Sequence, residues 1–380
     1  MIDVKGTVTS AGSRYIATHS KPATADAECL KIARQRNVWF VGKTNLGELG
    51  LGISGANNFF GTPLNPVRPK LRLVPGGSSS GSAVAVASGM ADVAFGTDTA
   101  GSIRVPAACC GVVGLKTTFG LISTKGVVPI SSYALDTVGP IAKDIPHLIE
   151  GMDLLQEGFA GHYRKVAATM PSGRALRVGR LYIPGTDPVV DQAVDNALAA
   201  AGFRVVRLNE QFAKEWDQAN KDGTKVAAAS GWLTDGWYLD KSGINGITKA
   251  AIRLGKLNFN NGFEEALARR AGWQKTLRKT FESVDLIATP TLLGLPPSIS
   301  FMGRSAILEL RVLRIQNTVA VNFAGNPAIA MPIPANFPRA PLSSLQLIAP
   351  PRHEAELLRA GQIVESKVWE TPLGQWSKAQ

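Results

Sequence analysis

The sequence is poor in cysteine and histidine and has no long hydrophobic run. Its 380 residues include four histidines and three cysteines, Cys29, Cys109 and Cys110. An odd number of cysteines, two of them adjacent and none in CxxC spacing, argues against a disulfide framework or a zinc site, so we expect three buried free thiols. The most apolar windows, residues 83–91 and 318–331, are too short or too interrupted by Asn, Gly and Pro to cross a bilayer. We therefore expect no membrane span.

The N-terminus lacks the basic start, apolar middle and small-residue cleavage site of a signal peptide, which favours a cytoplasmic location. The net charge of +12 is compatible with nucleic-acid binding, because basic surfaces bind phosphate. However, the basic residues are scattered in local pairs, with no run of five and no interleaved aromatic residues. We therefore expect no nucleic-acid partner.

The apolar residues alternate between helical and strand-like patterns along the chain. Residues 175–208 follow the order strand, helix, strand, which predicts a βαβ unit with parallel pairing. Further patterns predict a helix over 25–36, a strand over 38–41, one long helix over 249–283 and a strand over 286–289. We found no internal repeat, linker or low-complexity tail, so we predict a single α/β domain over residues 1–380.

A glycine- and serine-rich stretch at residues 76–82 is the most informative part of the sequence. Such clusters are usually linkers, but this one runs directly into small apolar residues that predict a helix beginning near Ser80 to Ser82. A phosphate-binding loop is excluded because no Gly-Lys-Ser/Thr closes the stretch. The Gly-Lys-Thr at 42–44 has Asn37 where the first glycine should be, so we expect Lys43 to be structural or solvent-facing.

The same stretch contains a G-x-S-x-G match over residues 77–81, which would make Ser79 a hydrolase nucleophile with a histidine base. The four histidines, His19, His147, His162 and His353, all lie in polar or turn-like contexts, which disfavours a Ser/Asp/His triad. A second serine loop, GTDTAGSIRVP at 96–106, follows after one predicted helix and one predicted strand. Two serine loops and so few histidines suggest a base other than imidazole.

Residues 75–118, PGGSSSGSAVAVASGMADVAFGTDTAGSIRVPAACCGVVGLKTT, resemble the signature of the amidase signature family nearly residue for residue. The similarity continues through 25–52, 57–66, 284–291, 322–334 and 344–358, and is weakest over 209–282. The resemblance implies a mixed, twisted β-sheet covered by helices on both faces. It also implies a serine hydrolase that acts on amides and needs neither a metal nor an organic cofactor.

In the family that the sequence resembles, one serine attacks the amide carbonyl, a second serine held by a cis peptide relays its proton, and a lysine is the base. By motif position, the resemblance implies Ser102 as the nucleophile and Ser78 as the bridging serine. It also implies that the bond between Gly77 and Ser78 is cis and that Ser79 hydrogen-bonds within the relay.

The resemblance also assigns roles to the residues around Ser102. The backbone N–H groups of Thr99, Ala100, Gly101 and Ser102 would form the oxyanion hole, with Ala100 in place of the more usual glycine. Asp98 and Arg104 flank this loop and would brace it as an ion pair.

The family's lysine lies in the pattern Lys-Asp-x-Ile-x-x-x-Gly. Ile2 and Gly6 match this pattern, so the Asp would stand directly before Met1 and the lysine one residue further upstream. Lys5 matches a variable position and is a weak candidate for the base. We therefore expect the chain to be truncated at its N-terminus, and its activity to fall by several orders of magnitude without the lysine.

These observations lead to one main hypothesis and two alternatives. The first is an amidase that hydrolyses small linear amides through an acyl-Ser102 intermediate. The others are the glutamine-hydrolysing subunit of a tRNA-dependent amidotransferase, and a non-catalytic protein that retained the fold. Residues 231–261 show no glutamine-specific pattern. The sequence leaves open which amide is the substrate and whether the protein is a homo-oligomer.

Overall fold

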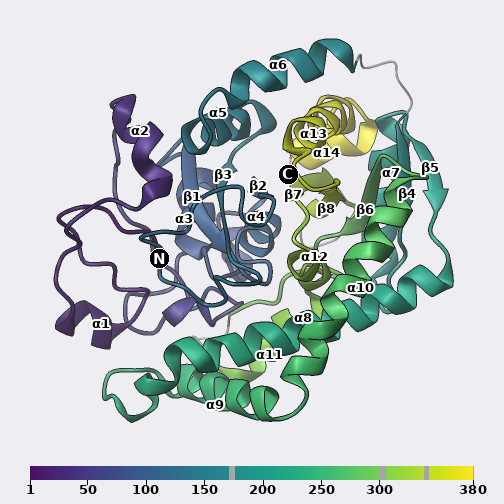
Figure 1. The fold of residues 1–380 in the computed structure, drawn as a ribbon. Coiled ribbons are helices and arrows are strands. Elements are labelled where there is room, and N and C mark those ends of the chain that lie inside the picture. The colour runs from purple at the N-terminus through teal and green to yellow at the C-terminus, as the bar shows by residue number, and fades with distance from the viewer. Residues whose placement is uncertain (171–175, 300–304, 338–341, 380) are drawn as a thin grey trace.

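A computed structural model describes residues 1–170, 176–299, 305–337 and 342–379 (Figure 1). In these residues, one eight-stranded sheet has the order β1-β3-β2-β7-β8-β6-β4-β5. Strand β4 is parallel to β5 and to β6, whereas the other neighbouring strands are antiparallel. The prediction of a mixed sheet is therefore confirmed. The strands are β1 Val93–Asp98, β2 Val113–Lys116, β3 Thr137–Ala142, β4 Arg177–Arg180, β5 Arg204–Arg207, β6 Leu286–Pro290, β7 Ala328–Pro334 and β8 Leu342–Ile348.

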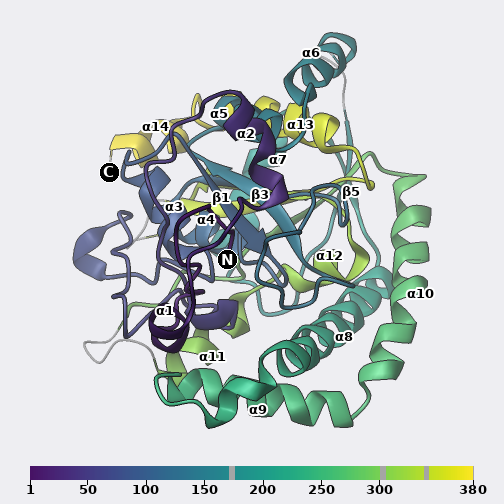
Figure 2. The ribbon, with the colours of Figure 1, turned by 60° about the vertical axis from the view of Figure 1, so that its left-hand side comes forward.

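Helices surround the sheet and also extend beyond it. They are α1 Arg14–His19, α2 Lys31–Gln35, α3 Ser80–Ala87, α4 Arg104–Cys110, α5 Ile145–Leu155, α6 Phe159–Thr169, α7 Pro188–Ala200, α8 Glu210–Asp235, α9 Gly246–Asn260, α10 Phe263–Phe281, α11 Ala306–Ile315, α12 Val319–Ala324, α13 Glu354–Val368 and α14 Pro372–Ala379. Four short 3₁₀ helices are η1 Glu28–Leu30, η2 Glu48–Gly50, η3 Pro69–Leu71 and η4 Gly236–Asp240. Figure 2 shows α8, α9 and α10 along one edge of the molecule.

The sheet is covered on both faces, as predicted. Successive side chains of a strand point to opposite faces. On β7, Ile329 belongs to the hydrophobic cluster that includes α5, α7 and α13, whereas the next residue, Ala330, belongs to the cluster that includes α3 and α4. On β6, Leu286 packs in the first cluster and Ile287 packs against α8, α10 and α12.

Small residues allow close packing at the β3–β2 end of the sheet. A Cβ atom on Gly139 of β3 would lie 2.0 Å from the carbonyl oxygen of Leu115 on β2. A Cβ atom on Gly114 would lie 2.8 Å from that of Ala107 on α4. Neither position can hold a side chain, so glycine at these two positions lets β3 lie close to β2 and lets β2 lie close to α4.

Several local predictions are confirmed. Helix α3 begins at Ser80, and the predicted βαβ unit is formed by β4, α7 and β5, with Arg177 paired to Arg204. All three cysteines are buried and free. Among the described residues, we find no helix with the length and apolarity that crossing a membrane requires.

Two local predictions are wrong. Residues 38–41 form no strand: Trp39 is 84% exposed, and no strand in the described part of the chain pairs with this segment. The helix predicted over 249–283 is two helices, α9 and α10. The chain breaks at Gly262, whose φ of +85° is a left-handed conformation that ends helices. The apolar spacing continues across this break because both helices pack against α8.

Candidate active site

The two serine loops lie against each other. Residues 99–103 connect β1 to α4, and Ser79 directly precedes α3. The backbone N–H of Ser79 donates to the carbonyl oxygen of Ser102 at 3.2 Å. The Ser79 hydroxyl points to the carbonyl oxygen of Thr97 at 3.5 Å. Ser78 and Ser79 are buried, whereas Ser102 is partly exposed and therefore accessible to a ligand.

The peptide bond between Gly77 and Ser78 is cis, as the resemblance implied. A Cβ atom on Gly77 would lie 2.4 Å from the carbonyl oxygen of Gly52, so this position requires glycine. The carbonyl oxygen of Ser78 accepts hydrogen bonds from the backbone N–H groups of Gly47 at 3.1 Å and Ser80 at 2.8 Å. Ser78 is thus fixed from two sides by backbone contacts.

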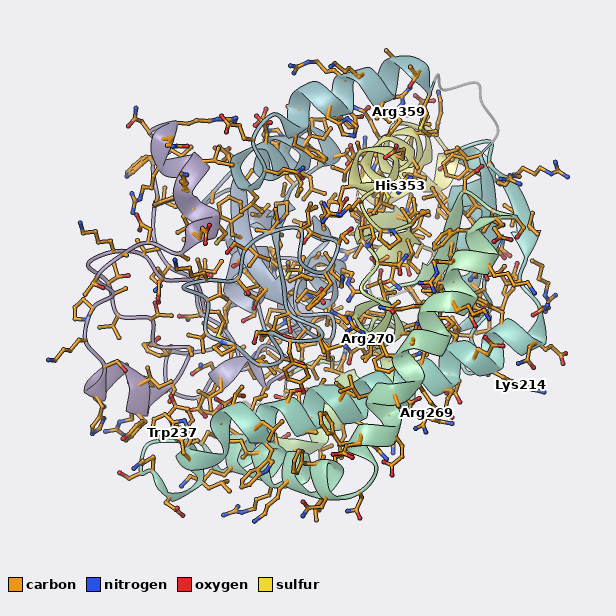
Figure 3. The ribbon with its side chains drawn as sticks, viewed as in Figure 1. Lys214, Trp237, Arg269, Arg270, His353 and Arg359 are labelled. Carbon is orange, nitrogen blue, oxygen red and sulfur yellow. The ribbon has the colours of Figure 1, made fainter. Side chains whose placement is uncertain are left out.

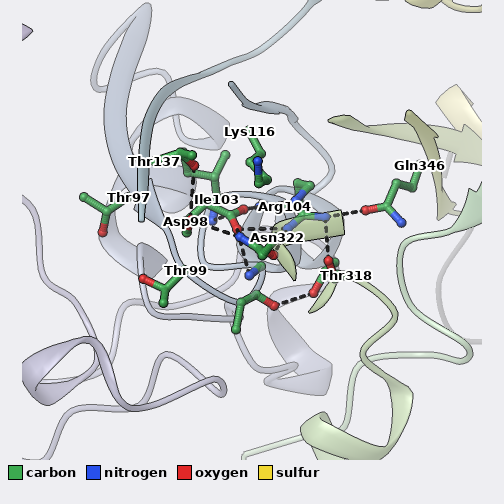
Figure 4. A network of polar contacts seen from close by, with 12 residues as sticks. Thr97, Asp98, Thr99, Ile103, Arg104, Lys116, Thr137, Thr318, Asn322 and Gln346 are labelled. Carbon is green, nitrogen blue, oxygen red and sulfur yellow. Dashed lines mark hydrogen bonds and ion pairs between the residues drawn. The ribbon is translucent and has the colours of Figure 1, made fainter. Parts of the chain in front are cut away.

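A buried ion pair braces the Ser102 loop, as predicted. Arg104 and Asp98 have fully buried side chains, with Nη2 2.9 Å from Oδ1 and Nε 3.1 Å from Oδ2 (Figure 4). Burial alone would raise the pKa of Asp98, but the charge and hydrogen bonds of Arg104, with a hydrogen bond from Asn322, lower it to about 2. Asp98 therefore stays ionised, and it also accepts from the backbone N–H of Gly101 at 2.8 Å and of Ile103 at 3.2 Å.

Arg104 also connects the loop to distant parts of the chain. Its Nη1 donates to the carbonyl oxygen of Thr318 at 3.0 Å and to Oε1 of Gln346 at 2.7 Å. Asn322 of α12 donates from Nδ2 to Oδ1 of Asp98 at 2.7 Å. Figure 4 shows these groups converging on the loop from β8 and α12. Since every polar group in the network is buried and paired, the loop is held in one conformation.

The backbone N–H groups that were predicted to form an oxyanion hole differ in whether they already have a hydrogen-bond acceptor. The N–H of Gly101 already donates to Asp98, so in this conformation Gly101 anchors the loop. Gly101 has φ of +128°, and a Cβ atom there would lie 2.1 Å from Oγ1 of Thr318. The carbonyl oxygen of Ala100 accepts from Oγ1 of Thr318 at 2.6 Å and from the side-chain amide of Gln316. Among the hydrogen bonds between described residues, none uses the N–H of Ala100 or Ser102, which leaves both as donors for a ligand.

The sequence did not identify the partner of Thr99. Its hydroxyl donates to Oδ1 of Asp136 at 2.6 Å. The other oxygen of Asp136 accepts from the backbone N–H groups of Ile130 and Ser131, each at 2.9 Å. Burial raises the pKa of Asp136 above its ordinary value. The only signal in the sequence was a carboxylate directly before the apolar strand β3, which does not indicate its partner.

None of three lysines, Lys5, Lys43 and Lys116, has a hydrogen bond to Ser78, Ser79 or Ser102 among the described residues. Lys5 is exposed. Lys43 donates from Nζ to Oγ1 of Thr9 at 2.7 Å, which agrees with the structural role expected for it. Lys116, which the sequence patterns did not single out, is buried and donates to the carbonyl oxygens of Thr117 at 2.9 Å and Asn326 at 2.8 Å, and burial lowers its pKa to about 7.

Three of the histidines have partners that are not serines of the two loops. Nδ1 of His19 contacts the carbonyl oxygen of Tyr15, Nδ1 of His147 contacts Asp144, and Nδ1 of His353 contacts the carbonyl oxygen of Pro351. His162 is exposed. These contacts agree with the argument against a Ser/Asp/His triad.

Comparison with known proteins gives a consistent result. A family model described as Amidase matches residues 1–358. A glutamyl-tRNA(Gln) amidotransferase subunit from Natronomonas pharaonis is 32% identical over 402 aligned residues, which cover 95% of this chain and 92% of that protein. The 2-amino-5-chloromuconic acid deaminase of Comamonas testosteroni is 32% identical, over 89% of this chain and 74% of that protein. A solved structure from a vestigial protein complex, described as revealing the origins of an s-triazine catabolic enzyme, has a TM-score of 0.81 at 26% identity and covers 96% of this chain and 82% of its own.

Proposed function

The chain belongs to the amidase family, whose members share the amidase signature, and from that premise we propose that it hydrolyses the C–N bond of a small linear carboxamide through an acyl-Ser102 intermediate. The observation that carries the proposal is the contact between the two serine loops. Ser102 is accessible at the end of a loop fixed by the Asp98–Arg104 pair, and the buried Ser78 lies on the segment directly against it. A rigid nucleophile beside a second hydroxyl suits acyl transfer.

In the proposed reaction, Oγ of Ser102 forms a bond to the amide carbonyl carbon while its proton passes to Oγ of Ser78. Ser78 in turn gives its own proton to the base. The backbone N–H groups of Thr99, Ala100 and Ser102 donate hydrogen bonds to the oxygen on which negative charge develops. The C–N bond then breaks as the nitrogen takes back a proton through Ser78. Water finally attacks the acyl-Ser102 ester, which releases the acid and regenerates the serine.

We test as the base a lysine supplied two residues before Met1, the position that the family pattern gives it relative to Ile2 and Gly6. Residues 1–3 are fixed against residues 126–128, because the N–H of Val128 donates to the carbonyl oxygen of Met1 and the N–H of Asp3 donates to that of Gly126, each at 2.9 Å. Two residues span at most about 7 Å, so a lysine there would extend from a defined starting point. Its amine would accept the proton from Ser78.

The proposal is tested by ammonia release from a panel of primary amides. Two forms are compared: the chain as it stands, and a form with Lys-Asp placed directly before Met1. We expect the Lys-Asp form to be faster by roughly 10³-fold or more, since activity without the base rests on the oxyanion hole alone. Ser102→Ala in that form should abolish turnover, whereas Ser88→Ala, at the exposed end of α3, should not. Turnover that survives Ser102→Ala would reject Ser102 as the nucleophile.

A second candidate function is the glutamine-hydrolysing subunit of an amidotransferase. The similarity over nearly the full length of the N. pharaonis amidotransferase protein supports it. The two candidates differ in substrate preference, so the ratio of kcat/KM for glutamine to that for propionamide separates them. A preference for glutamine that increases when partner proteins are added would favour the amidotransferase. Equal or lower activity on glutamine would favour the free amidase.

A further inference from the structure

A cavity of about 550 Å³, which we call the 119–136 cavity, is lined in part by Asp136, the hydrogen-bond partner of Thr99. This volume is within the usual range for small-molecule sites. Its walls are partly apolar and partly hydroxylated. They are formed by Phe119, Gly120, Ile122, Ser123, Thr124, Lys125, Val127, Pro129, Ser132 and Asp136.

Asp136 connects this cavity to the proposed chemistry. The carboxylate that lines the cavity is the one that accepts from the hydroxyl of Thr99 at 2.6 Å, and Thr99 is three residues before Ser102. The cavity is therefore next to the loop on which the acyl group would be held. A substrate bound at Ala100 and Ser102 has the 119–136 cavity as a neighbouring space for its remaining atoms.

The cavity lining contains one carboxylate, that of Asp136, and one ammonium group, that of Lys125, and the two differ in how far they are already paired. Both oxygens of Asp136 are already engaged, one by Thr99 and the other by two backbone N–H groups. The ammonium group of Lys125 forms no hydrogen bond or ion pair with any described residue, and its side chain is exposed. Glu28 is the nearby acid, but its carboxylate accepts from the Ser123 hydroxyl at 3.1 Å. Lys125 is thus the cation that a ligand in the cavity would meet.

A second cation lies behind the cavity wall. The guanidinium of Arg270 lies 5.2 Å from the centre of the Phe119 ring and donates to the carbonyl oxygens of Phe323 and Ala134. Its contacts are to neutral groups, so its positive charge is not cancelled by a carboxylate. Figure 3 shows Arg270 near the middle of the view, where α10 meets the core. Arg270 and Lys125 together offset the negative charges of Asp136 and Glu28, and of the two cations only Lys125 lines the cavity.

We propose that the 119–136 cavity binds the non-reacting end of the substrate and that Lys125 selects amides whose short apolar body carries a carboxylate at that end. This inference rests on the proposed amide hydrolysis at Ser102, because it assigns the reacting end of the substrate to that loop. It specifies a chemical class, anionic monoamides, that the catalytic residues by themselves do not require.

The test uses succinamate, which has one amide and one carboxylate, and succinamide, its neutral diamide counterpart. Binding of each to the full chain is measured by NMR titration at low salt. We expect succinamate to bind about fivefold more tightly, a preference that weakens as salt is added, since the ammonium group of Lys125 is exposed. Lys125→Ala should reduce the preference to less than twofold, and Lys125→Glu should reverse it. Lys214→Ala, an exposed lysine at the outer edge in Figure 3, is the matched control and should leave the preference unchanged.

A variant that fills the 119–136 cavity tests whether the substrate binds there, independently of the charge of Lys125. Ser132 is exposed on the rim, so Ser132→Trp should preserve the fold and weaken binding of both amides. Equal binding of the two amides by the unmodified chain, or a preference that survives Lys125→Ala, would overturn the proposal. The two proposals fail separately: binding selectivity without Ser102-dependent turnover rejects the hydrolysis, whereas turnover without selectivity rejects the role of Lys125.

Discussion

Replacing Arg104 by methionine is expected to destabilise the protein by about 3–5 kcal/mol, because it leaves the Asp98 carboxylate buried without its cation. Both side chains are fully buried, and the guanidinium donates to Asp98, Thr318, Asn322 and Gln346. Methionine fills similar space but donates nothing, so three uncharged acceptors also lose a partner. The measurement is equilibrium urea unfolding followed by tryptophan fluorescence.

The pH dependence of the destabilisation by Arg104→Met tests whether the buried charge of Asp98 causes it. In the native protein the pKa of Asp98 is lowered from 3.8 to about 2, which contributes about 2 kcal/mol. A carboxylate whose pKa is lower in the folded than in the unfolded state stabilises the fold at every pH above its unfolded-state pKa. This contribution is lost as the pH falls from about 4 towards 2. Without Arg104, burial dominates and the pKa of Asp98 rises above 3.8. Arg104→Met should therefore be most destabilising near pH 8 and approach the parent protein as the pH falls.

A surface ion pair provides the matched control. Arg177 and Asp285 are 3.1 Å apart, but their side chains are 41% and 27% exposed, so Arg177→Met should cost at most about 1 kcal/mol. If Arg104→Met costs no more than Arg177→Met, or if its cost does not change between pH 8 and pH 4, the argument from a buried charge is wrong.

Three further predictions follow from the site and its surroundings. Gly101→Ala should cost at least about 3 kcal/mol in urea unfolding, because φ is +128° and the new Cβ would lie 2.1 Å from Oγ1 of Thr318; a normal urea midpoint would contradict this. Asp136→Asn should lower kcat about tenfold with little change in KM, since it weakens a charge-assisted hydrogen bond from Thr99; a change in KM alone would reject the positioning role. Burial raises the pKa of Asp235 to about 7, and Oδ2 has no hydrogen-bond partner among the described residues, so native stability should fall as the pH rises from about 4 to 7. Asp235→Asn should therefore be more stable than the parent by up to about 4 kcal/mol at pH 8, and equal thermal midpoints at that pH would contradict this.

The main elements of the fold could be predicted because their patterns are local. The start of α3 at Ser80 and the β4-α7-β5 unit follow from residue order and apolar spacing. The break at Gly262 could not be predicted with the same certainty, because glycine is also tolerated within helices. In the structure Gly262 has a φ of +85°, and α9 and α10 on its two sides both pack against α8.

The residues of the two serine loops were predicted, but most of their partners were not. Asp98 and Arg104 are six residues apart, so an ion pair between them was a local inference. Asn322 and Gln346 are more than 200 residues from Asp98, and no pattern near them indicates contact with a serine loop. The free N–H groups of Ala100 and Ser102, and the anchored one of Gly101, likewise depend on backbone orientation.

The sequence by itself determined the family and the two serine loops, because residues 75–118 match the family's signature in residue type and spacing, and the mixed α/β architecture was implied by that resemblance. Only the tertiary structure determined which groups satisfy the buried charges of Asp98 and Arg104, and which cation faces the 119–136 cavity. The physical reason is that a buried polar group must be paired, whereas the identity of its partner depends on which distant strands and helices the fold brings next to it.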